Sequence, residues 1–457
     1  MKKTRIGALA LGVSATLLTM TACSGAAEEA PKAAELAAGE VNFGSGHWKN
    51  LVAIDMTDAD PEVPSSTVVL AQAPYWDHST EEIGIQKGYY ADAGIAIGPE
   101  PSGKIVPMDQ VASSLLTGQL DVGTMVPQIW APQLDSDLGV ALFTWRDVMI
   151  GHSILASPKT RNKSVKEFMA DGLDWDSAVV EALDQVRGKK LYVSNDPAPR
   201  AFYSVAIAAG GLDKSDLDMQ TLDEKSVQGL ALGGKADYVA PGSGPNLTQL
   251  MAQGWVQIVS TGDILENGDD EDINDAVTGT GLAASHDWLE GNPDTAMRMA
   301  SVGYRIVDFK ESDPIGSGAI QIPFINSIAG TNFKISDAKI FDEQIDPFFT
   351  FEEQEEFFEN ESSPLYWRKG LEASFANLKR QGLLKNDHDP DELVWAASTW
   401  QTLKALRVAA EPIIAELKAD STLSKKAEDQ LQEAEQFFEA RNYFDALRFA
   451  NAAKLNS

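Results

Sequence analysis

Short apolar runs alternate with segments of helical spacing in the first third of the chain. The apolar runs have the length and β-branched content of strands, and they cover Thr67–Ala71, Ile95–Ile97, Leu120–Thr124, Gly139–Trp145 and Met149–Ala156. Segments of helical period separate the first three runs, from about Ser79 to Gly94 and across Val111–Leu116. Such alternation predicts a mostly parallel, doubly wound α/β sheet, in which small molecules bind beyond the carboxyl ends of the strands.

The same rhythm restarts in the middle of the chain. Its predicted elements are a strand ending at Ser194, a helix over Ala201–Ala209, a strand over Asp218–Leu222, a helix over Ser226–Leu232 and a strand over Val256–Ser260. Between them, Gly233-Gly-Lys-Ala-Asp-Tyr-Val-Ala240 echoes Gly118-Gln-Leu-Asp-Val-Gly123. In both segments a helix is followed by a glycine, an aspartate and a strand that leads into a loop. This internal repeat predicts a second lobe built like the first.

Helical spacing dominates the last third of the chain. The predicted helices cover Thr295–Phe309, Phe348–Phe358, Tyr366–Leu384, Leu393–Leu417 and Ala427–Leu455, the last with a break near Asn442. The segment Asn442–Ala453 resembles the second half of a tetratricopeptide repeat, but one partial repeat cannot form a solenoid. The sequence therefore favours a small helical bundle packed on the main body, and leaves open a module that docks a partner.

The amino terminus has the pattern of a secretory signal. Met1-Lys-Lys-Thr-Arg5 is basic, and the apolar run Ile6–Leu18 is too short to span a bilayer. The junction Leu18-Thr-Met-Thr-Ala-Cys23 resembles a bacterial lipobox, which predicts a signal peptide over residues 1–22 and lipid attachment at Cys23. A lipidated cysteine would hold the protein at the extracytoplasmic face of the cell membrane. The alternative is an incidental cysteine in a cleaved or tethering segment.

A flexible tether is expected to follow Cys23 over residues 23–65, which are rich in Ala, Glu, Pro, Asp and Ser. Two pieces of it, Asn42–Trp48 and Leu51–Ile54, are apolar enough to lie against the folded body. Because Cys23 is the only cysteine of the chain, no disulfide can form within it.

Charge excludes one class of partner. The 457 residues include 37 Lys and Arg against 68 Asp and Glu, a formal net charge of -31. A nucleic acid would be repelled by this surface, so we expect no nucleic-acid partner. The charge does not define the ligand, since one local basic site can bind an anion on an acidic protein, and a saline habitat would also account for it.

Two motifs carry a family resemblance. Ile83-Gly-Ile-Gln-Lys-Gly-Tyr-Tyr-Ala-Asp-Ala-Gly-Ile95, followed by Leu115-Leu-Thr-Gly-Gln-Leu-Asp-Val-Gly123, resembles the opening of the nitrate, sulfonate, taurine and thiamine-precursor binding proteins of ABC importers. The resemblance extends over about Thr67–Asn386 and is strongest before Asp263. It implies a two-lobed periplasmic-binding-protein fold of type II, with two doubly wound sheets joined by a hinge, that captures a small solute and delivers it to permease subunits.

The resemblance also implies the domain boundaries. Lobe 1 is expected over residues 66–157 and 278–386, and lobe 2 over residues 158–277. In this scheme Met149–Ala156 is the last strand before the chain crosses to lobe 2, and residues 158–175 are a surface insertion. Residues 387–457 go beyond the family pattern as a C-terminal helical extension.

The first loop of lobe 1 supplies four candidate ligand contacts. Tyr75 and Trp76 offer flat apolar walls, and Asp77 or His78 a polar contact of fixed direction. The alternative is that Pro74, Tyr75 and Trp76 only fix the loop against the core. No metal site is expected, because the five histidines are scattered and no close spacing of His, Asp and Glu occurs.

The next two strands of lobe 1 end in groups suited to an anion. Thr124, Met125 and Gln128 precede or begin a helix whose amides can bind an oxyanion, although Thr124 can equally be an ordinary cap. Trp145 and Arg146 end the following strand, and a guanidinium there would pair with sulfonate, carboxylate or phosphate. Alternatively, Arg146 is paired with its neighbour Asp147.

Two loops of lobe 2 complete the candidate site, and their candidate residues are Ser194, Asn195, Arg200, Gly242, Ser243 and Asn246. Pro197 and Pro199 preset a helix start and leave the following amides free. In the family the equivalent turn is usually rich in Ser and Gly, so prolines and Asp196 at this turn depart from a simple sulfonate or nitrate pocket. The loop Pro241–Asn246 resembles a position that closes over the ligand, or is a plain turn.

No signature of catalysis or of a cofactor is present. Gly242-Ser-Gly244 lacks the five-residue nucleophile elbow, and no glycine-rich segment has the spacing of a phosphate loop. We therefore expect a monomeric binding protein without a cofactor. Its aromatic loop favours an organic solute, which we expect to be anionic and sulfonate- or taurine-like. Two alternatives remain: a ligand sensor or interaction protein, and a thiamine-pyrimidine synthase-like enzyme, whose cysteine-rich iron site one cysteine cannot supply.

Overall fold

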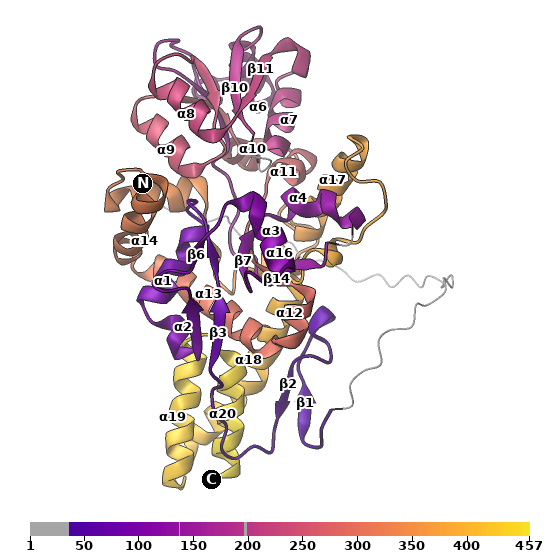
Figure 1. Ribbon diagram of the computed structural model, residues 1–457, viewed down its shortest axis with the longest axis vertical. Coiled ribbons are helices and arrows are strands. Elements are labelled where there is room, and N and C mark those ends of the chain that lie inside the picture. The colour runs from indigo at the N-terminus through magenta and orange to yellow at the C-terminus, as the bar shows by residue number, and fades with distance from the viewer. Residues whose placement is uncertain (1–35, 137, 196–198) are drawn as a thin grey trace. The chain divides into compact units, whose positions relative to one another are not determined.

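The computed structural model describes residues 36–136, 138–195 and 199–457 (Figure 1). Residues 36–457 form one compact unit. The predicted signal peptide, Cys23 and the first part of the predicted tether lie outside the described residues. Within the described residues, no helix combines the length and the apolar character that crossing a membrane requires. The compact unit contains two main sheets, which we call the sheets of lobe 1 and lobe 2.

The sheet of lobe 1 is assembled from pieces far apart in the sequence. The strand order β7-β14-β8 is antiparallel throughout, and a parallel bridge from Leu70 to Val122 connects it to the parallel pair of β3 and β5. These strands are β3 (Ser66–Val69), β5 (Ile95–Gly98), β7 (Gly123–Met125), β8 (Val140–Leu142) and β14 (Gly281–Ser285). The helices around them are α1 (Glu81–Gln86), α2 (Tyr89–Asp92), α3 (Met108–Leu116), α4 (Pro127–Trp130), α13 (Pro293–Ser312), α14 (Pro314–Ala329) and α17 (Trp367–Arg380).

The sheet of lobe 2 has five strands in the order β11-β10-β12-β9-β13. They are β9 (Ser153–Ala156), β10 (Lys190–Ser194), β11 (Asp218–Leu222), β12 (Tyr238–Ala240) and β13 (Val256–Ser260). Its helices are α5 (Val165–Ala170), α6 (Trp175–Asp184), α7 (Arg200–Ala209), α8 (Glu224–Leu232), α9 (Gly244–Ala252), α10 (Thr261–Asn267) and α11 (Asp270–Ala276). The predicted strands and helices of this half are present close to their expected bounds.

One strand that we predicted in lobe 1 lies in lobe 2. We assigned Met149–Ala156 to lobe 1, whereas β9 pairs antiparallel with β12 and β13 in the sheet of lobe 2. The apolar pattern could not show which of the two sheets this strand joins, because a strand buried on both faces is a continuous apolar run in either sheet. The chain therefore crosses between the lobes before β9, near Gly151.

The internal repeat has a structural basis in two glycines. Gly118 follows α3 and Gly234 follows α8, with φ of +68° and +64°, a left-handed conformation that favours glycine and ends a helix. An aspartate comes three residues later in both lobes. In lobe 1 its carboxylate is used locally, since Oδ2 of Asp121 accepts a hydrogen bond from the amide of Val69 at 2.7 Å.

The two crossings of the chain between the lobes lie side by side. Met149 forms an antiparallel bridge with Thr278, and the amide of Met149 donates to the carbonyl of Thr278 at 2.7 Å. A third segment joins them, because Phe348 bridges Asp147 and the amide of Ile150 donates to the carbonyl of Ile345 at 2.8 Å. The hinge between the lobes is thus a set of three backbone segments, residues 146–151, 277–280 and 345–349.

The third hinge segment replaces part of a predicted helix. We expected helix over Phe348–Phe358, but only α16 (Glu355–Phe358) is helical there. The backbone of Phe349 instead donates to the carbonyl of Arg146 at 2.9 Å. A pairing with residues about 200 positions earlier outweighs local helical propensity, which is a weak preference.

The predicted tether is shorter than expected. β1 (Glu40–Asn42) and β2 (Ala53–Asp55) pair antiparallel, and between them Trp48 is fully buried. The indole of Trp48 donates to Oγ1 of Thr399 at 2.8 Å and its ring lies edge-on to Trp395. The expectation of a flexible tether up to residue 65 is therefore wrong from residue 40 onward. The burial of Trp48, Val52 and Ile54 together helps to offset the entropy lost by ordering this segment.

The C-terminal extension is a helical hairpin on a long helix. α18 (Ala396–Ala419), α19 (Lys425–Glu439) and α20 (Tyr443–Leu455) share one hydrophobic core with lobe 1. Asn442 caps α20, and its side-chain oxygen accepts from the amide of Asp445 at 3.2 Å. The buried Asp445 binds Arg298 of α13 through two hydrogen bonds of 2.7 and 2.9 Å. These contacts agree with a bundle packed on the main body.

We predict that the Arg298–Asp445 pair holds the extension in place. Arg298 is 2% and Asp445 0% exposed, so Asp445→Ala leaves a buried guanidinium without its carboxylate. The free energy of unfolding should fall by about 3–5 kcal/mol, measured by denaturant titration. The matched control is Lys454→Ala, which breaks the exposed pair of α20 with Glu416 and should cost at most about 1 kcal/mol. Equal effects of the two variants would contradict this assignment.

Candidate functional site

The first loop of lobe 1 is buried where lobe 1 meets the hinge. Asp77 and His78 are 3% and 2% exposed, and Nε2 of His78 lies 3.5 Å from Oδ2 of Asp77. Burial lowers the pKa of His78 below its usual value, against the opposing effect of Asp77, so the imidazole is neutral at pH 7. Both side chains therefore point into the protein, as candidate ligand contacts would.

Trp76 lies in the core of lobe 1. Its ring stacks on Phe341 with 4.6 Å between the centroids, and its indole donates to Oδ1 of Asp342 at 2.7 Å. Asp342 also pairs with Lys310 of α13 at 2.8 Å, and the ammonium lies 4.8 Å above the Trp76 ring. Trp76 thus fixes the loop against the core, the alternative that the sequence left open, and it is fully buried.

Arg146 is paired within lobe 1, but not with Asp147. Its guanidinium binds the carboxylate of Glu81, at the first position of α1, and the hydroxyl of Tyr90 binds the same carboxylate. Arg146 is 3% exposed and Glu81 is fully buried. Glu81 therefore binds one nitrogen of the guanidinium, whereas Nε and Nη1 of Arg146 are buried without a hydrogen-bond partner among the described residues.

Asp147 is held by the returning chain. Its Oδ1 accepts hydrogen bonds from the amide and the hydroxyl of Thr280, at 2.9 and 2.8 Å. Burial and the nearby charge of Asp77 raise the pKa of Asp147 to about 7, although the bonds from Thr280 oppose the shift. A carboxyl in this state changes its charge readily when a new charge comes close.

Asp346 brings a third buried carboxyl to the same place. It is 2% exposed, and its Oδ1 has no hydrogen-bond partner among the described residues. Burial raises the pKa of Asp346 well above its usual value, and the charges of Asp77 and Asp147 raise it further. No pattern in the sequence indicates that Asp346 belongs to this site, because it lies in an irregular stretch about 270 residues away from the first loop.

These side chains form one buried group at the hinge, which we call the hinge cluster. It consists of Asp77, His78, Glu81, Arg146, Asp147, Lys310, Asp342 and Asp346. Five of its members are carboxyls and two are basic side chains, so the carboxyls outnumber the basic groups by three. The raised pKa values of Asp147 and Asp346 favour their neutral forms, which reduces the negative charge of the cluster.

Lobe 2 reaches the hinge cluster through α9. A Cβ atom on Gly244, the first residue of α9, would lie 2.7 Å from Cγ2 of Ile345 and 3.9 Å from Oδ2 of Asp346. A Cβ atom on Gly151 would likewise be 2.9 Å from Cα of Ile345. The two glycines allow lobe 2 to approach the segment around Ile345 closely. Asp346 therefore lies where the two lobes meet.

The loop Pro241–Asn246 is satisfied by Glu224 of α8. The carboxylate of Glu224 accepts from the amides of Gly242 and Ser243, at 2.9 and 3.2 Å, and from the side-chain amide of Asn246 at 2.6 Å. These are the groups expected to close over an anionic ligand. A carboxylate of the protein occupies them, as Glu81 does at Arg146.

The ring of Tyr75 lies against the hinge cluster, with its centroid 5.3 Å from that of His78. The other predicted residues of lobe 1 do not join the hinge cluster. Gln128 and Trp145 line a small crevice between α4, α11 and α17, with a volume of about 20 Å³. Thr124 and Met125 are buried in β7, and α4 is preceded by Val126 without a side-chain cap. Thr124 is therefore not the cap that we considered.

The first loop of lobe 2 also lies away from the hinge cluster in its described part. Ser194 ends β10 and is buried, whereas Asn195 and Arg200 are exposed. The guanidinium of Arg200 donates to the carbonyl of Asn195 at 3.2 Å, which closes the turn. We expected Trp76, Thr124, Asn195 and Ser243 to face one crevice, but Trp76 is in the core and Asn195 is in solvent.

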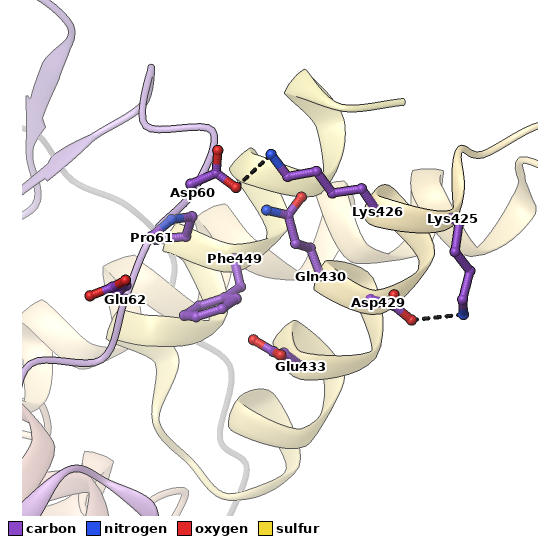
Figure 2. Close-up of a pocket in the computed structure, with 9 residues that line it drawn as sticks. All are labelled: Asp60, Pro61, Glu62, Lys425, Lys426, Asp429, Gln430, Glu433 and Phe449. Atoms are coloured by element: carbon purple, nitrogen blue, oxygen red, sulfur yellow. Dashed lines mark hydrogen bonds and ion pairs between the residues drawn. The ribbon is translucent and has the colours of Figure 1, made fainter.

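The described part of the surface also has hollows away from the hinge cluster. Figure 2 shows one of about 500 Å³ between the segment Asp60–Glu62 and helices α19 and α20. Its charged side chains are paired locally, Lys426 with Asp60 at 2.5 Å and Lys425 with Asp429 at 2.7 Å. Among the residues that the structure describes, no group of three or more His, Cys, Asp and Glu side chains could hold a metal ion.

Comparison with solved structures identifies the fold. The periplasmic aliphatic sulphonate-binding protein SsuA of Escherichia coli is 12% identical, with a TM-score of 0.51 over 74% of this chain and 92% of that one. The nitrate-binding protein NrtA of Synechocystis PCC 6803 is 15% identical, with a TM-score of 0.49 over 76% and 90%. The likeness to the Escherichia coli protein shows the two-lobed periplasmic-binding-protein fold, to which this chain adds C-terminal helices. No protein-family model matches the sequence, and no curated protein matches it.

The hinge cluster generates a prediction for pH. In the folded protein Asp147 keeps its proton up to about pH 7, whereas an unfolded chain releases it near about pH 3.9. Between these values the folded state binds more protons, so the contribution of Asp147 to the free energy of unfolding falls as the pH rises. Asp147→Asn keeps an acceptor for the amide of Thr280 and removes the titration.

The stability of Asp147→Asn relative to the wild type should therefore increase with pH and level off above about pH 7. Denaturant titrations of both proteins across this range measure it. Asp121→Asn, at the acceptor of the Val69 amide, is the control for a half-buried carboxylate outside the hinge cluster. A constant difference between Asp147→Asn and the wild type would show that Asp147 is ionised throughout.

Proposed function

We propose that this protein is the solute-binding component of an ABC importer, with no catalytic role of its own. The observation that carries the proposal is the hinge: paired backbone segments join two α/β lobes, and buried polar side chains gather where the lobes meet. The fold shared with the E. coli aliphatic sulphonate-binding protein supports it. Permease subunits would be the partners that receive the solute.

Binding would act by shifting a population of open and closed forms. A solute that contacts both lobes has those contacts only in the closed form, so its binding energy favours closure. Gly244 and Gly151 lack side chains where the lobes approach Ile345, which permits the close contact of the closed form. The hinge cluster is buried in the structure described, so the solute would enter when the lobes open.

The solute proposed is a small organic molecule. The sequence favoured an anion of the sulfonate or taurine type, bound by Arg146 and by the loop before α9. Glu81 and Glu224 occupy those groups. The function proposed is capture of a small organic solute at the hinge cluster, and the anionic character predicted from the sequence stays a prediction.

The lipid anchor remains part of the proposal and rests on the sequence. Leu18–Cys23 has the lipobox pattern, and Cys23 would carry the acyl groups that keep the protein on the extracytoplasmic side of the membrane. The structure begins to be described at Leu36, only a few residues before the β1–β2 hairpin.

We predict that closure depends on the space at Gly244. Gly244→Leu places a side chain against Ile345 and should weaken solute binding by at least about tenfold, because it disfavours the closed form. Gly229→Leu on α8 is the control, since nothing lies within 4 Å of the Cβ position there. Thermal-shift titrations and small-angle scattering measure binding and compaction. The proposal fails if no solute compacts the wild-type protein.

A second prediction concerns Cys23. In a bacterial host that processes lipoproteins, the wild-type protein should incorporate labelled fatty acid and enter the detergent phase on Triton X-114 partition. Cys23→Ala should incorporate none and remain in the aqueous phase, because the acylated side chain is absent. The same partition of the two proteins would argue against the anchor while leaving the solute-binding function untouched.

A further inference from the structure

One segment of lobe 1 covers the first loop as a single layer. Residues 334–345, which we call the strap, consist of η5 (Ile335–Asp337), α15 (Ala338–Ile340) and the π-helical turn η6 (Phe341–Ile345). Its inward side chains Ala338, Phe341 and Ile345 are buried, whereas its outward side chains Lys339 and Glu343 are 73% and 56% exposed. One layer of chain therefore separates the first loop from solvent at this place.

Both ends of the strap are fixed to the protein. At its start, Oδ1 of Asn326 on α14 accepts a hydrogen bond from the amide of Phe333 at 2.8 Å. At its end, the carbonyl of Ile345 accepts a hydrogen bond from the amide of Ile150 in the hinge, also at 2.8 Å. A short segment that is anchored at both ends and exposed along one face can open locally while the rest of the lobe stays folded.

The strap presents an aromatic ring and an acid group to the first loop. The ring of Phe341 stacks on that of Trp76, with 4.6 Å between the centroids and 18° between the planes. Oδ1 of the next residue, Asp342, accepts from the indole of Trp76 at 2.7 Å and binds Nζ of Lys310 at 2.8 Å. The strap thus buries Trp76, and two consecutive strap residues place on it the two groups that an aromatic acid carries.

The groups beneath the strap are held by long helices of lobe 1. Lys310 is on α13, and its ammonium also donates to Oε1 of Gln321 on α14 at 2.6 Å. The side-chain amide of Gln321 donates to Oγ of Ser79 at 3.1 Å and to the carbonyl of Trp76 at 3.3 Å. These bonds do not involve the strap, so Trp76 and Lys310 would keep their positions when the strap lifts.

An exchange of the strap for a solute is limited by Lys310. The side chain of Asp342 is 21% exposed and can return to water, whereas that of Lys310 is 4% exposed and cannot. A buried ammonium that loses its carboxylate is unfavourable, so the departure of Asp342 favours entry of another anion. A ring on the same solute would restore the stacking that Trp76 loses with Phe341. The exchange therefore selects a solute with both a ring and an acid group.

We propose that Trp76 and Lys310 form a binding site for an aromatic acid, which the strap occupies through Phe341 and Asp342 until the solute displaces it. The proposal rests on the solute-binding function proposed above and names the class of solute. The ring of the solute would stack on Trp76. Its carboxylate or sulfonate would accept from the indole and from the ammonium of Lys310, in place of Asp342.

Displacement of the strap also reaches lobe 2. Ile345 ends the strap and lies against the start of α9, because a Cβ atom on Gly244 would be 2.7 Å from Cγ2 of Ile345. Met251 of α9 packs against the hydrophobic cluster that contains Trp76, Phe341 and Ile345. A solute that displaces the strap would therefore change a contact between the lobes, which links occupation of the site to their arrangement.

Matched compounds test the class of solute on the full-length protein. Benzoate, phenylacetate and benzenesulfonate are the aromatic acids, benzamide and benzyl alcohol the neutral aromatic compounds, and acetate and ethanesulfonate the aliphatic acids. We expect at least one aromatic acid to raise the melting temperature more than either control set does. Hydrogen exchange of the amides of residues 334–345 should become faster in this complex, because the strap leaves the site, whereas a segment that closes over a solute would exchange more slowly.

Variants on the two sides of the contact should act in opposite directions. Lys310→Met should weaken binding of the active acid at least about tenfold, because the site loses its ammonium. Asp342→Asn should tighten binding at least about tenfold, because a neutral amide competes less well with the solute for Lys310. Glu343→Gln, at the next and exposed position of the strap, is the matched control and should bind as the wild type does.

The outcomes separate this proposal from the importer function. Unchanged or weaker binding by Asp342→Asn would overturn the exchange with the strap, and equal stabilisation by neutral aromatic compounds would overturn the part of Lys310. Compaction by an aliphatic sulfonate, taurine or nitrate without a response to aromatic acids keeps the importer function and overturns the aromatic acid. A protein that responds to none of these compounds overturns both the aromatic acid and the solute-binding function.

Discussion

The pairing of three distant backbone segments at the hinge is the constraint on which the rest of this structure depends. Residues 146–151 leave lobe 1, residues 277–280 return to it, and residues 345–349 lie against the first. Their amides and carbonyls satisfy one another, so the irregular chain between the two sheets carries few unpaired backbone groups. The same pairing brings Asp147 and Asp346 to one place from positions about 200 residues apart.

Carboxylates of the protein take over the positions at which a fold of this kind can offer positive charge. Glu81 neutralises Arg146, and Glu224 accepts hydrogen bonds from the amides before α9. Both glutamates begin a helix, and their side chains reach groups that the sequence marked as ligand contacts. Because a buried ion pair is costly to break, the pair of Arg146 and Glu81 is a fixed part of lobe 1.

The β1–β2 hairpin and the C-terminal helices pack on the core of lobe 1. The β1–β2 hairpin buries Trp48 against α18, and Arg298 of α13 binds Asp445 of α20. Both contacts join elements to the core of lobe 1. The core of lobe 2 contains residues of its own sheet and helices, with few from the extension. Lobe 1 together with the C-terminal extension therefore has the larger core.

Local sequence determined the elements and the class of fold. Alternation of apolar runs with helical periods, and the repeated glycine and aspartate at Gly118–Asp121 and Gly234–Asp237, are properties of neighbouring residues, so they could be read without coordinates. Strand bounds such as those of β11 and β13 were predicted for the same reason. Asp77 and His78, which the sequence nominated as ligand contacts, belong to the hinge cluster, and their role as ligand contacts stays a prediction.

Only the tertiary structure decided which charges meet. Nothing local to Asp346, Glu81 or Glu224 indicates their partners, because each partner lies on another element and electrostatic energy depends on distance in space. The assignment of β9 to lobe 2 and the buried position of Trp48 have the same origin, since both are set by long-range packing. The two-lobed architecture could therefore be predicted from the sequence alone. The chemistry where the lobes meet is decided by contacts between side chains that are distant in the sequence.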